Sequence, residues 1–347
     1  MKKTLKKILT IFCIFILLII IFIVSYGIIE NSKINKIVKS HTINQVLEDN
    51  SLKNNNSKYI STAVQQIMIG TMCNNYENAL QTLLNIKNAG YDSIELNDFM
   101  THKTSMLVKL MTKFSGMSIG NADKLDWSKL IEESGLKVIS LHTDLANIEN
   151  NPKEIADKAK KFGTDTVVIT GMYKFDYSSL DDVKELAQSL NNAGKALSEE
   201  GIRLLYHNHN CELQKVNSEK TAYDIIIEYT DPEYVNFEFD SYWFADGGAN
   251  VPAIMEKLGT RMKLWHINDR GYNKSGPYMT PILKENATEL GYGNMDLDTL
   301  SEIAIKNGVE GVILETHQNW IDNDPIKSIE LSADYIKEKF NNVIINN

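Results

Sequence analysis

The sequence predicts a (β/α)8 barrel, an α/β fold in which eight parallel strands alternate with helices. Eight short β-rich runs alternate with longer amphipathic segments over about 280 residues, which is the count and size of this fold. The expected strands are residues 67–71, 93–96, 137–141, 166–170, 203–207, 235–240, 263–268 and 312–315. A doubly wound open sheet is the alternative, but no glycine-rich dinucleotide-binding loop follows the first run.

Helical patterns fill the intervals between these runs. They cover residues 78–88, 155–162, 183–200, 223–229, 251–258 and 297–307. Several helical segments end in a glycine just before the next run, where a left-handed residue can turn the chain back into a strand. These glycines are Gly90, Gly135, Gly163, Gly201 and Gly308. Their placement supports repeated strand–helix units.

Two segments exceed ordinary loop length. Residues 97–127 follow the second strand and contain a helical pattern at 106–111, and residues 269–294 follow the seventh strand and are rich in glycine. Loops after barrel strands lie on the catalytic face. We expect the second segment to cover the site, whereas for the first a solvent-exposed insertion without function is an equal alternative.

The N-terminal part of the chain differs in composition from the rest. Residues 1–7 form a basic tail, and residues 8–29 form an uncharged run that is long enough to span a bilayer as a helix. A cleaved signal peptide is the alternative, but the run is too long and no small-residue cleavage site follows it. The lysines before the run predict a cytoplasmic N-terminus, although further lysines follow it. We therefore expect a single-pass membrane anchor with an extracytoplasmic barrel.

Three further parts complete the expected organisation. Residues 30–60 are a polar stalk or linker, residues 61–340 are the catalytic barrel, and residues 341–347 are a tail. The net charge of −9 argues against a nucleic-acid partner, because phosphate contacts need clustered lysine and arginine. Three cysteines are too few and too scattered for a disulfide framework, so we expect free thiols.

Polar and charged residues gather where the expected strands end. Five of the seven histidines fall at such an end, and in a barrel these ends converge on one pocket. The residues at the ends are Glu95, Asn97, His142, Asp144, His207, His209, Glu212, Glu238, Asp240, His266, Asn268, Asp269, Glu315 and His317. Histidine and carboxylate without cysteine suit Mn²⁺, Zn²⁺, Co²⁺, Fe²⁺ or Mg²⁺.

Asp240, His266 and Glu315 are the preferred metal ligands, because they project from three neighbouring strands in phase with the apolar residues below them. A helix cap is the alternative role for Asp240, and a salt bridge is the alternative for Glu315. His207 and His209 could be a satisfied buried pair, but beside the other three residues we expect them to line the site.

Other residues are expected around this site. His142 is predicted to line the pocket, and Trp243 is either core packing or an apolar wall for a sugar ring. His317 is either a substrate contact or a loop residue. Glu95 is either a structural carboxylate or one that supports a ligand from behind, and Glu238, one layer deeper than Asp240, is expected to be structural.

Several motifs, in order along the chain, resemble one known family. They are residues 89–95 (AGYDSIE), 206–209 (YHNH) with Glu212, 237–243 (FEFDSYW), 265–269 (WHIND), 289–293 (ELGYG) and 314–315 (LE). From about residue 61 to residue 337 the chain resembles the sugar phosphate isomerase/epimerase family, the xylose-isomerase-like barrels related to endonuclease IV.

The resemblance implies a divalent metal held by Glu, Asp, His and Glu from strands 5 to 8. Asp240, His266 and Glu315 match the last three positions, whereas His207 stands at the position of the strand-5 glutamate. Family epimerases use the two glutamates for proton transfer, so this departure puts a symmetric mechanism in doubt. Asn268 stands where many relatives carry a lysine that could hold a phosphate or an enolate oxygen.

We therefore expect a divalent-metal-dependent isomerase or epimerase that removes a proton next to a carbonyl of an unphosphorylated sugar. Glu315, Glu212 or His207 would carry protons or hold the metal, and His209 and Asn268 would contact the substrate. The alternatives are a lyase or hydrolase of a keto-glycoside with the same enolate chemistry, and a non-catalytic carbohydrate-binding barrel. The identity of the metal, the substrate and the oligomeric state are left open.

Overall fold

The computed structural model describes residues 2–41, 59–114, 117–272, 285–316 and 318–345. The chain divides into two compact units, residues 1–42 and residues 43–347. The first unit is a single helix, α1, which spans Lys2–Ser40. By length and composition it can cross a membrane, although a signal sequence near an N-terminus meets the same criterion. The helix continues 11 residues beyond Ile29, so the first part of the expected stalk is helical, and residues 42–58 lie outside the described part of the chain.

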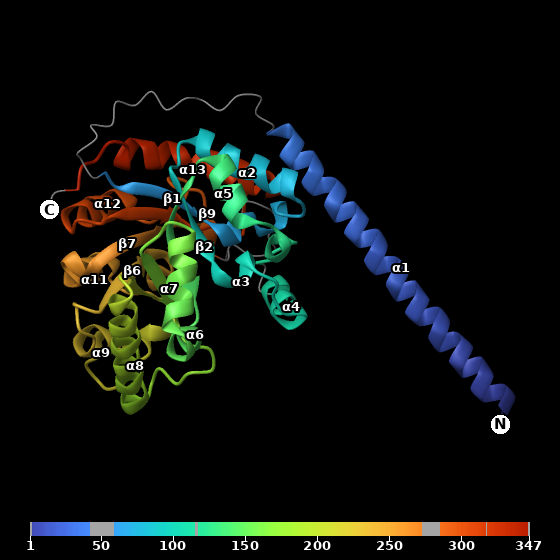
Figure 1. Cartoon of the computed structure of the whole chain (residues 1–347), viewed down its shortest axis with the longest axis horizontal. Helices are drawn as coiled ribbons and strands as arrows, with labels where there is room; N and C mark the ends of the chain where they lie inside the picture. The colour runs from blue at the N-terminus through green and yellow to red at the C-terminus, as the bar shows by residue number, and fades with distance from the viewer. Residues whose placement is uncertain (1, 42–58, 115–116, 273–284, 317, 346–347) are drawn as a thin grey trace. The chain divides into compact units, whose positions relative to one another are not determined.

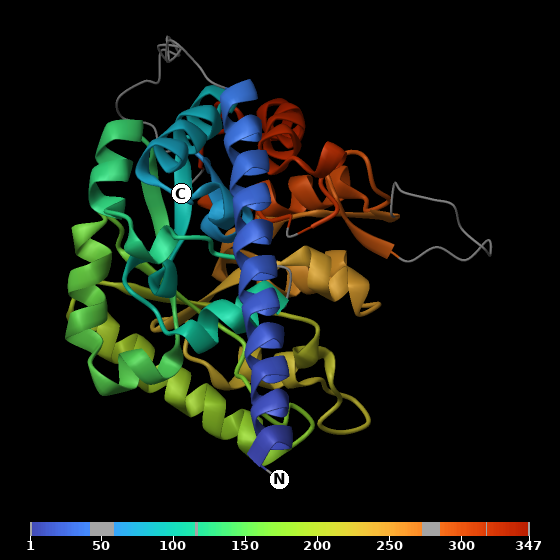
Figure 2. The same cartoon turned by 90° about the vertical axis from the view of Figure 1, so that its right-hand side faces the viewer.

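The second unit is a closed barrel of eight parallel strands, which confirms the predicted fold class (Figures 1 and 2). Around the barrel the strands follow the order β1-β10-β7-β6-β5-β4-β3-β2. Their bounds are β1 Ser61–Gln65, β2 Ser93–Asn97, β3 Lys137–Thr143, β4 Thr166–Thr170, β5 Arg203–His207, β6 Val235–Asp240, β7 Met262–Ile267 and β10 Gly311–Leu314. β4, β5 and β6 match their predicted limits, and each end of β2, β3, β7 and β10 lies within two residues of the predicted limit.

Helices surround the barrel on its outside (Figure 1). They are α2 Tyr76–Ala89, α5 Trp127–Ser134, α7 Pro152–Lys161, α8 Leu180–Glu199, α9 Ala222–Tyr229, α11 Val251–Leu258, α12 Leu297–Lys306 and α13 Pro325–Phe340. Side chains of Asn75, Ser179 and Thr221 accept backbone N–H groups at the first turns of α2, α8 and α9. Gly90 ends α2 and Gly135 ends α5. Their φ values of 108° and 67° are the left-handed conformation that the sequence predicted.

The first strand was predicted in the wrong place. Residues 67–71 belong to a buried 3-10 helix, η1 Gln66–Met72, and the strand precedes it at Ser61–Gln65. The side chain of Gln65 accepts the backbone N–H of Ile67 at 2.6 Å, and this bond starts the helical turn. The strand itself carries Ala63 toward the barrel interior, where a small side chain fits, so the more apolar run that follows misled the pattern analysis.

The two long segments contain structure of their own. The segment after β2 forms α3 Asp98–Thr101 and α4 Met106–Phe114, with the expected extra helix. The segment after β7 was expected to be a loop, but its described parts pair as an antiparallel ribbon of β8 Asp269–Tyr272 and β9 Glu285–Thr288. Short helices also follow three other strands: α6 Leu145–Asn150, η3 Cys211–Leu213 and α10 Ser241–Asp246.

The barrel interior has an apolar layer directly below the polar ends of the strands. Ala63, Val168, Leu205, Leu264 and Ile313 form this layer. The main core lies outside the strands, between the sheet and the helices. Cys13, Cys73 and Cys211 are free thiols, as predicted.

Candidate metal centre and active site

Three strands carry a site residue two positions after a residue of the apolar layer. His207 follows Leu205 on β5, and His266 follows Leu264 on β7. Glu315 lies two positions after Ile313 and is the first residue after β10. Because side chains alternate along a strand, each of these residues faces the barrel axis, one layer above the apolar residues. The polar cluster is therefore a direct product of the strand pattern.

The first group of side chains at the barrel mouth consists of His207, Asp240, His266 and Glu315. Each offers one ligand atom, these atoms all lie within 4.8 Å of one another, and all four residues are buried. His266 Nδ1 lies 2.8 Å from Glu315 Oε2 and 4.0 Å from Asp240 Oδ2. Asp240 Oδ1 accepts the backbone N–H of Trp243 at 3.1 Å, whereas its buried Oδ2 has no hydrogen-bond partner.

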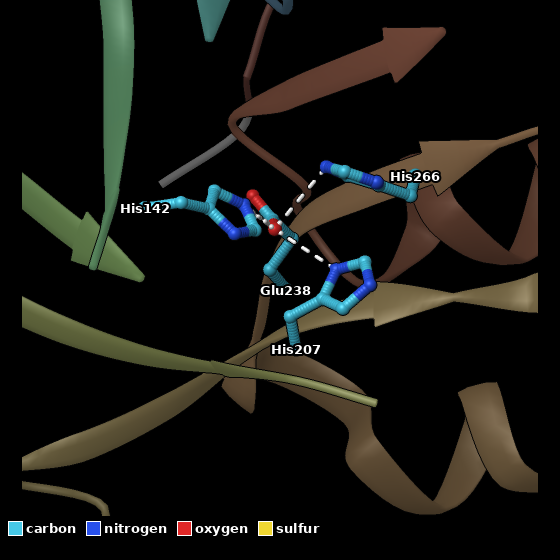
Figure 3. Close-up of side chains that lie close together, drawn as sticks. All are labelled: His142, His207, Glu238 and His266. Atoms are coloured by element: carbon cyan, nitrogen blue, oxygen red, sulfur yellow. Dashed lines mark hydrogen bonds and ion pairs between the residues drawn. The ribbon is translucent and has the colours of Figure 1, made fainter. Parts of the chain in front are cut away.

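A second group overlaps the first and contains His142, His207, Glu238 and His266 (Figure 3). Three imidazoles converge on one oxygen, Glu238 Oε2. The distances are 2.8 Å from His142 Nε2, 3.1 Å from His207 Nδ1 and 3.2 Å from His266 Nε2. The other oxygen of Glu238 is buried without a hydrogen-bond partner.

Glu95 supports this cluster from β2. Its Oε2 lies 2.6 Å from His266 Nε2 and 3.1 Å from His142 Nε2. The Ser140 hydroxyl donates to the other carboxylate oxygen in a short hydrogen bond. His266 is therefore held at both ring nitrogens, Nε2 by Glu95 and Nδ1 by Glu315.

Burial and charge act in opposite directions on the imidazoles. Burial lowers the pKa of His142, but the Glu95 and Glu238 carboxylates outweigh it and raise the pKa to about 10. The same balance, with Glu238, Glu95 and Glu315, raises the pKa of His266 well above its ordinary value. For His207 burial and the neighbouring His266 charge dominate, so its pKa is lowered.

The carboxylates respond in the same coupled way. Burial raises the pKa of Asp240 to about 8, because the attraction of His266 does not compensate for it. Burial also opposes ionisation of Glu238, but the His266 and His142 charges hold its pKa well below the usual range. In the metal-free chain, protons on imidazoles thus neutralise a cluster of buried carboxylates.

These residues fit a divalent cation. The donor set is nitrogen and oxygen only, which suits Mn²⁺, Zn²⁺, Co²⁺ or Mg²⁺. Asp240 Oδ2 and Glu238 Oε1 are buried oxygens without hydrogen-bond partners, and a cation would satisfy either one. Within the described part of the chain, the ion-pair partners of Glu95, Glu238 and Asp240 are all imidazoles, so a metal could replace their protons.

Glu212 lies outside both groups. It is fully buried in η3, where its carboxylate accepts the Tyr206 hydroxyl at 2.7 Å and the backbone N–H of His209 at 3.0 Å. Cys211 Sγ lies 3.1 Å from the same carboxylate. Burial raises the pKa of Glu212. These contacts give Glu212 a role in holding the turn that follows β5.

The remaining predicted residues lie around the cluster. His209 is half-buried, with its ring centre 5.1 Å from that of His207 and 5.6 Å from that of Trp243, so these side chains form one wall of the mouth. Asn268 is buried, and its amide donates to the Glu315 carbonyl while its oxygen accepts from Thr316. Asn268 thus ties β7 to the end of β10. His317 lies outside the described residues.

Sequence reasoning underestimated three members of the site. Glu95 and Glu238 were treated as equivocal or structural, and Ser140 was not considered. The end-of-strand position of Glu95 was a usable signal. Glu238 could be recognised only with the strand register, because it pairs directly with His207 across β5 and β6.

Fold and cluster together define a (β/α)8 barrel with a nitrogen and oxygen ligand set at its mouth. A sequence model described as a xylose isomerase-like TIM barrel matches residues 83–339, so the chain belongs to this family. This confirms the resemblance found in the sequence. An inosose dehydratase from Mesomycoplasma hyopneumoniae (strain J) is 24% identical over 275 residues, which cover 74% of this chain and 87% of the relative.

Solved structures agree with the fold. A sugar phosphate isomerase/epimerase from Parabacteroides distasonis superposes with a TM-score of 0.62 at 22% identity, over 80% of this chain and 97% of that one. An IolI protein with a bound zinc atom superposes with a TM-score of 0.56 at 17% identity, over 81% of this chain and 100% of that one. The family and fold are therefore shown, and the proteins to which the chain is similar include enzymes named as a dehydratase and as an isomerase/epimerase.

Proposed function

We propose that the chain binds one divalent metal ion through His207, Asp240, His266 and Glu315. The observation that carries this proposal is the buried Oδ2 of Asp240, which has no hydrogen-bond partner, in a group of four residues that each offer a ligand atom within 4.8 Å of the other three. Glu95 would then hold His266 from behind through Nε2, and such support orients an imidazole and increases its basicity.

The reaction that fits this site begins with removal of a proton next to the carbonyl of a sugar or polyol ketone. The bound metal ion would polarise the carbonyl oxygen and stabilise the negative charge of the enolate. Glu315 is the carboxylate nearest the mouth that can accept the proton. The protonated His142, which lies beside the cluster with 9% of its surface exposed, can donate one.

Elimination of water is the reaction that this asymmetric pair supports best. Glu315 takes the proton from carbon, the electron pair forms a double bond, and the neighbouring hydroxyl leaves as water with the proton from His142. A symmetric epimerase needs two proton-transfer carboxylates on opposite faces of the substrate, and here His207 replaces one of them. The name of the inosose dehydratase relative points in the same direction.

An isomerase or epimerase is the second candidate, and the likeness to a sugar phosphate isomerase/epimerase favours it. In that case His207 would not be a metal ligand and, with its lowered pKa, would serve as the second base in its neutral form, and Asp240, His266 and Glu315 would hold the metal. The substrate would be unphosphorylated in either case, since the position of the phosphate-binding lysine holds Asn268, and its amide is engaged with the Glu315 carbonyl.

NMR of reactions in D₂O tests the proposal. The full-length chain, loaded with Mn²⁺, is incubated with ketoses and with keto-cyclitols, and the Mn²⁺ is removed before spectra are recorded. Dehydration predicts a product one water lighter than the substrate, whereas epimerisation predicts deuterium at a carbon whose configuration has changed. Neither exchange nor product from any of these substrates, with metal bound, would contradict both candidates.

We also propose that α1 anchors the chain, with residues 1–7 in the cytoplasm and the barrel outside it. The lysines that precede the apolar run support this orientation. Protease added to intact cells should digest the barrel under this topology. A barrel that is cut only after the membrane is permeabilised would contradict it.

A further inference from the structure

Helix α4 carries its apolar side chains on the outside of the protein. The exposed apolar residues are Met106, Leu107, Leu110, Met111 and Phe114, and the exposed fraction reaches 85% at Met106 and 83% at Phe114. At 3.6 residues per turn these five side chains lie within an arc of about 140°. A helix of a globular domain ordinarily turns such a stripe toward the core, but α4 contains no buried residue.

The opposite, more polar face of α4 attaches the helix to the protein. Lys109 Nζ lies 2.5 Å from Oδ1 of the buried Asp123, and Lys109 and Thr112 are half-buried. The backbone N–H of Thr104 donates to the other oxygen of Asp123 at 3.3 Å. Asp123 therefore fixes the rotation of the helix, and the apolar stripe is presented outward.

The surroundings of the stripe are basic. Lys103, Lys113 and Lys124 lie in this part of the chain besides Lys109, which is paired with Asp123, and the whole segment 97–127 holds four lysines and three aspartates, at positions 98, 123 and 126. This local excess of positive charge occurs in a chain whose net charge is −9. Large apolar side chains bordered by lysines are typical of a helix that lies in the plane of an anionic bilayer surface, where lysine stems cover apolar surface and their ammonium groups reach the head groups.

The rest of the chain brings such a surface within reach. Helix α1 is long and apolar enough to cross a membrane, and residues 42–58 join its unit to the barrel. Even fully extended, 17 residues span at most about 60 Å. Short tethers raise the effective concentration of a second contact to about the millimolar range, so a weakly binding helix is sufficient.

We propose that α4 is a second membrane contact, which lies in the head-group region of the anionic bilayer that α1 would cross. Helix α4 follows the carboxyl end of β2 (Figure 1), so under this proposal the mouth of the barrel would face the bilayer. The proposal does not depend on the reaction that the barrel catalyses. The alternatives are that the apolar stripe of α4 packs against a second copy of the chain or against the mouth of the barrel.

Quenching by brominated lipid tests this contact. The full-length F114W chain is reconstituted into vesicles of phosphatidylcholine and phosphatidylglycerol, with and without brominated acyl chains, and the signal of the wild-type chain is subtracted. The matched control is Y229W, because Tyr229 is also exposed but ends α9 just before β6 begins, at the opposite end of the barrel. Resistance to carbonate extraction checks that each chain is anchored.

The proposal predicts that the difference signal of the F114W chain is quenched in anionic vesicles and less strongly quenched in pure phosphatidylcholine, and that the signal of the Y229W chain is not quenched. Equal quenching of the two variants would overturn it. So would the absence of quenching in an anchored F114W chain, and self-association in light scattering that F114E abolishes would then assign the stripe to a second copy of the chain. A chain that carbonate extracts would overturn the tether and with it the proposal.

Discussion

His207 Nδ1 lies 3.1 Å from Glu238 Oε2, and the two residues are direct partners in the register of β5 and β6. A carboxylate therefore stands on β6, beside the position where the family resemblance predicts a glutamate on β5. Three imidazoles share this one oxygen, so Glu238 sets the electrostatics of the whole site.

The first prediction concerns this pair. His207→Glu places a second carboxylate beside Glu238, and an uncompensated buried charge costs about 3 kcal/mol of the free energy of unfolding of the metal-free chain. Adding Glu238→Gln should recover most of that loss, because it removes the repulsion. Urea unfolding of the two single variants and the double variant measures the coupling. Additive effects of the two substitutions would show that the residues do not interact.

The second prediction concerns Glu95, which holds His266 Nε2 at 2.6 Å. Glu95→Gln should weaken metal binding about 10- to 100-fold, because the imidazole loses its anionic partner. Titration calorimetry with Mn²⁺ or Zn²⁺ measures the change. Glu310→Gln is the matched control, because Glu310 pairs with Arg203 at the other end of the strands and should leave the affinity unchanged. Equal affinities for wild type and Glu95→Gln would refute the supporting role.

The third prediction is a pH dependence of metal binding. With its pKa raised to about 8, the Asp240 carboxyl is protonated below that pH in the metal-free chain. Metal binding must expel this proton and one from the His266 imidazole, whose pKa is also raised, so the affinity should rise about a hundredfold per pH unit below pH 8 and less steeply above it. Calorimetry in buffers of different ionisation enthalpy counts the protons released. An affinity that does not change between pH 6 and pH 8 is incompatible with Asp240 as a ligand.

The fourth prediction separates Glu212 from the metal. Tyr206 and the backbone of His209 donate to its carboxylate, so Glu212→Gln should lower the free energy of unfolding by about 1–3 kcal/mol. Metal affinity should not change, and Tyr206→Phe should act in the same direction because it removes one donor. If Glu212→Gln instead lost metal with unchanged stability, Glu212 would be a ligand after all.

Much of this architecture could be predicted because the strands are short, apolar and sharply ended. Residues 203–207 and 235–240 were predicted with the bounds that β5 and β6 have, since polar residues follow each apolar run. β1 was missed because its strand is less apolar than the buried 3-10 helix after it. Hydrophobicity alone cannot distinguish two buried segments of similar length.

The contacts of Glu238 could not be predicted from one strand at a time. The register of β6 with β7 shifts between Phe237 and Glu238, and this irregularity determines which neighbours Glu238 meets. Its alignment with His207 depends on strands that are formed by residues about 30 positions apart. The projection of Asp240, His266 and Glu315 toward one centre, in contrast, needed only alternation along each strand and closure of the barrel.

The metal content of the purified full-length chain tests the central claim most directly. Wild type, Asp240→Asn and His266→Gln are each equilibrated with Mn²⁺ or Zn²⁺, desalted and analysed by mass spectrometry of the elements, with circular dichroism to check folding. We predict about one equivalent of divalent metal in the wild type, in line with a single four-ligand site, and a near-complete loss in both variants. A folded wild-type chain without metal, or variants that retain it, would contradict the account.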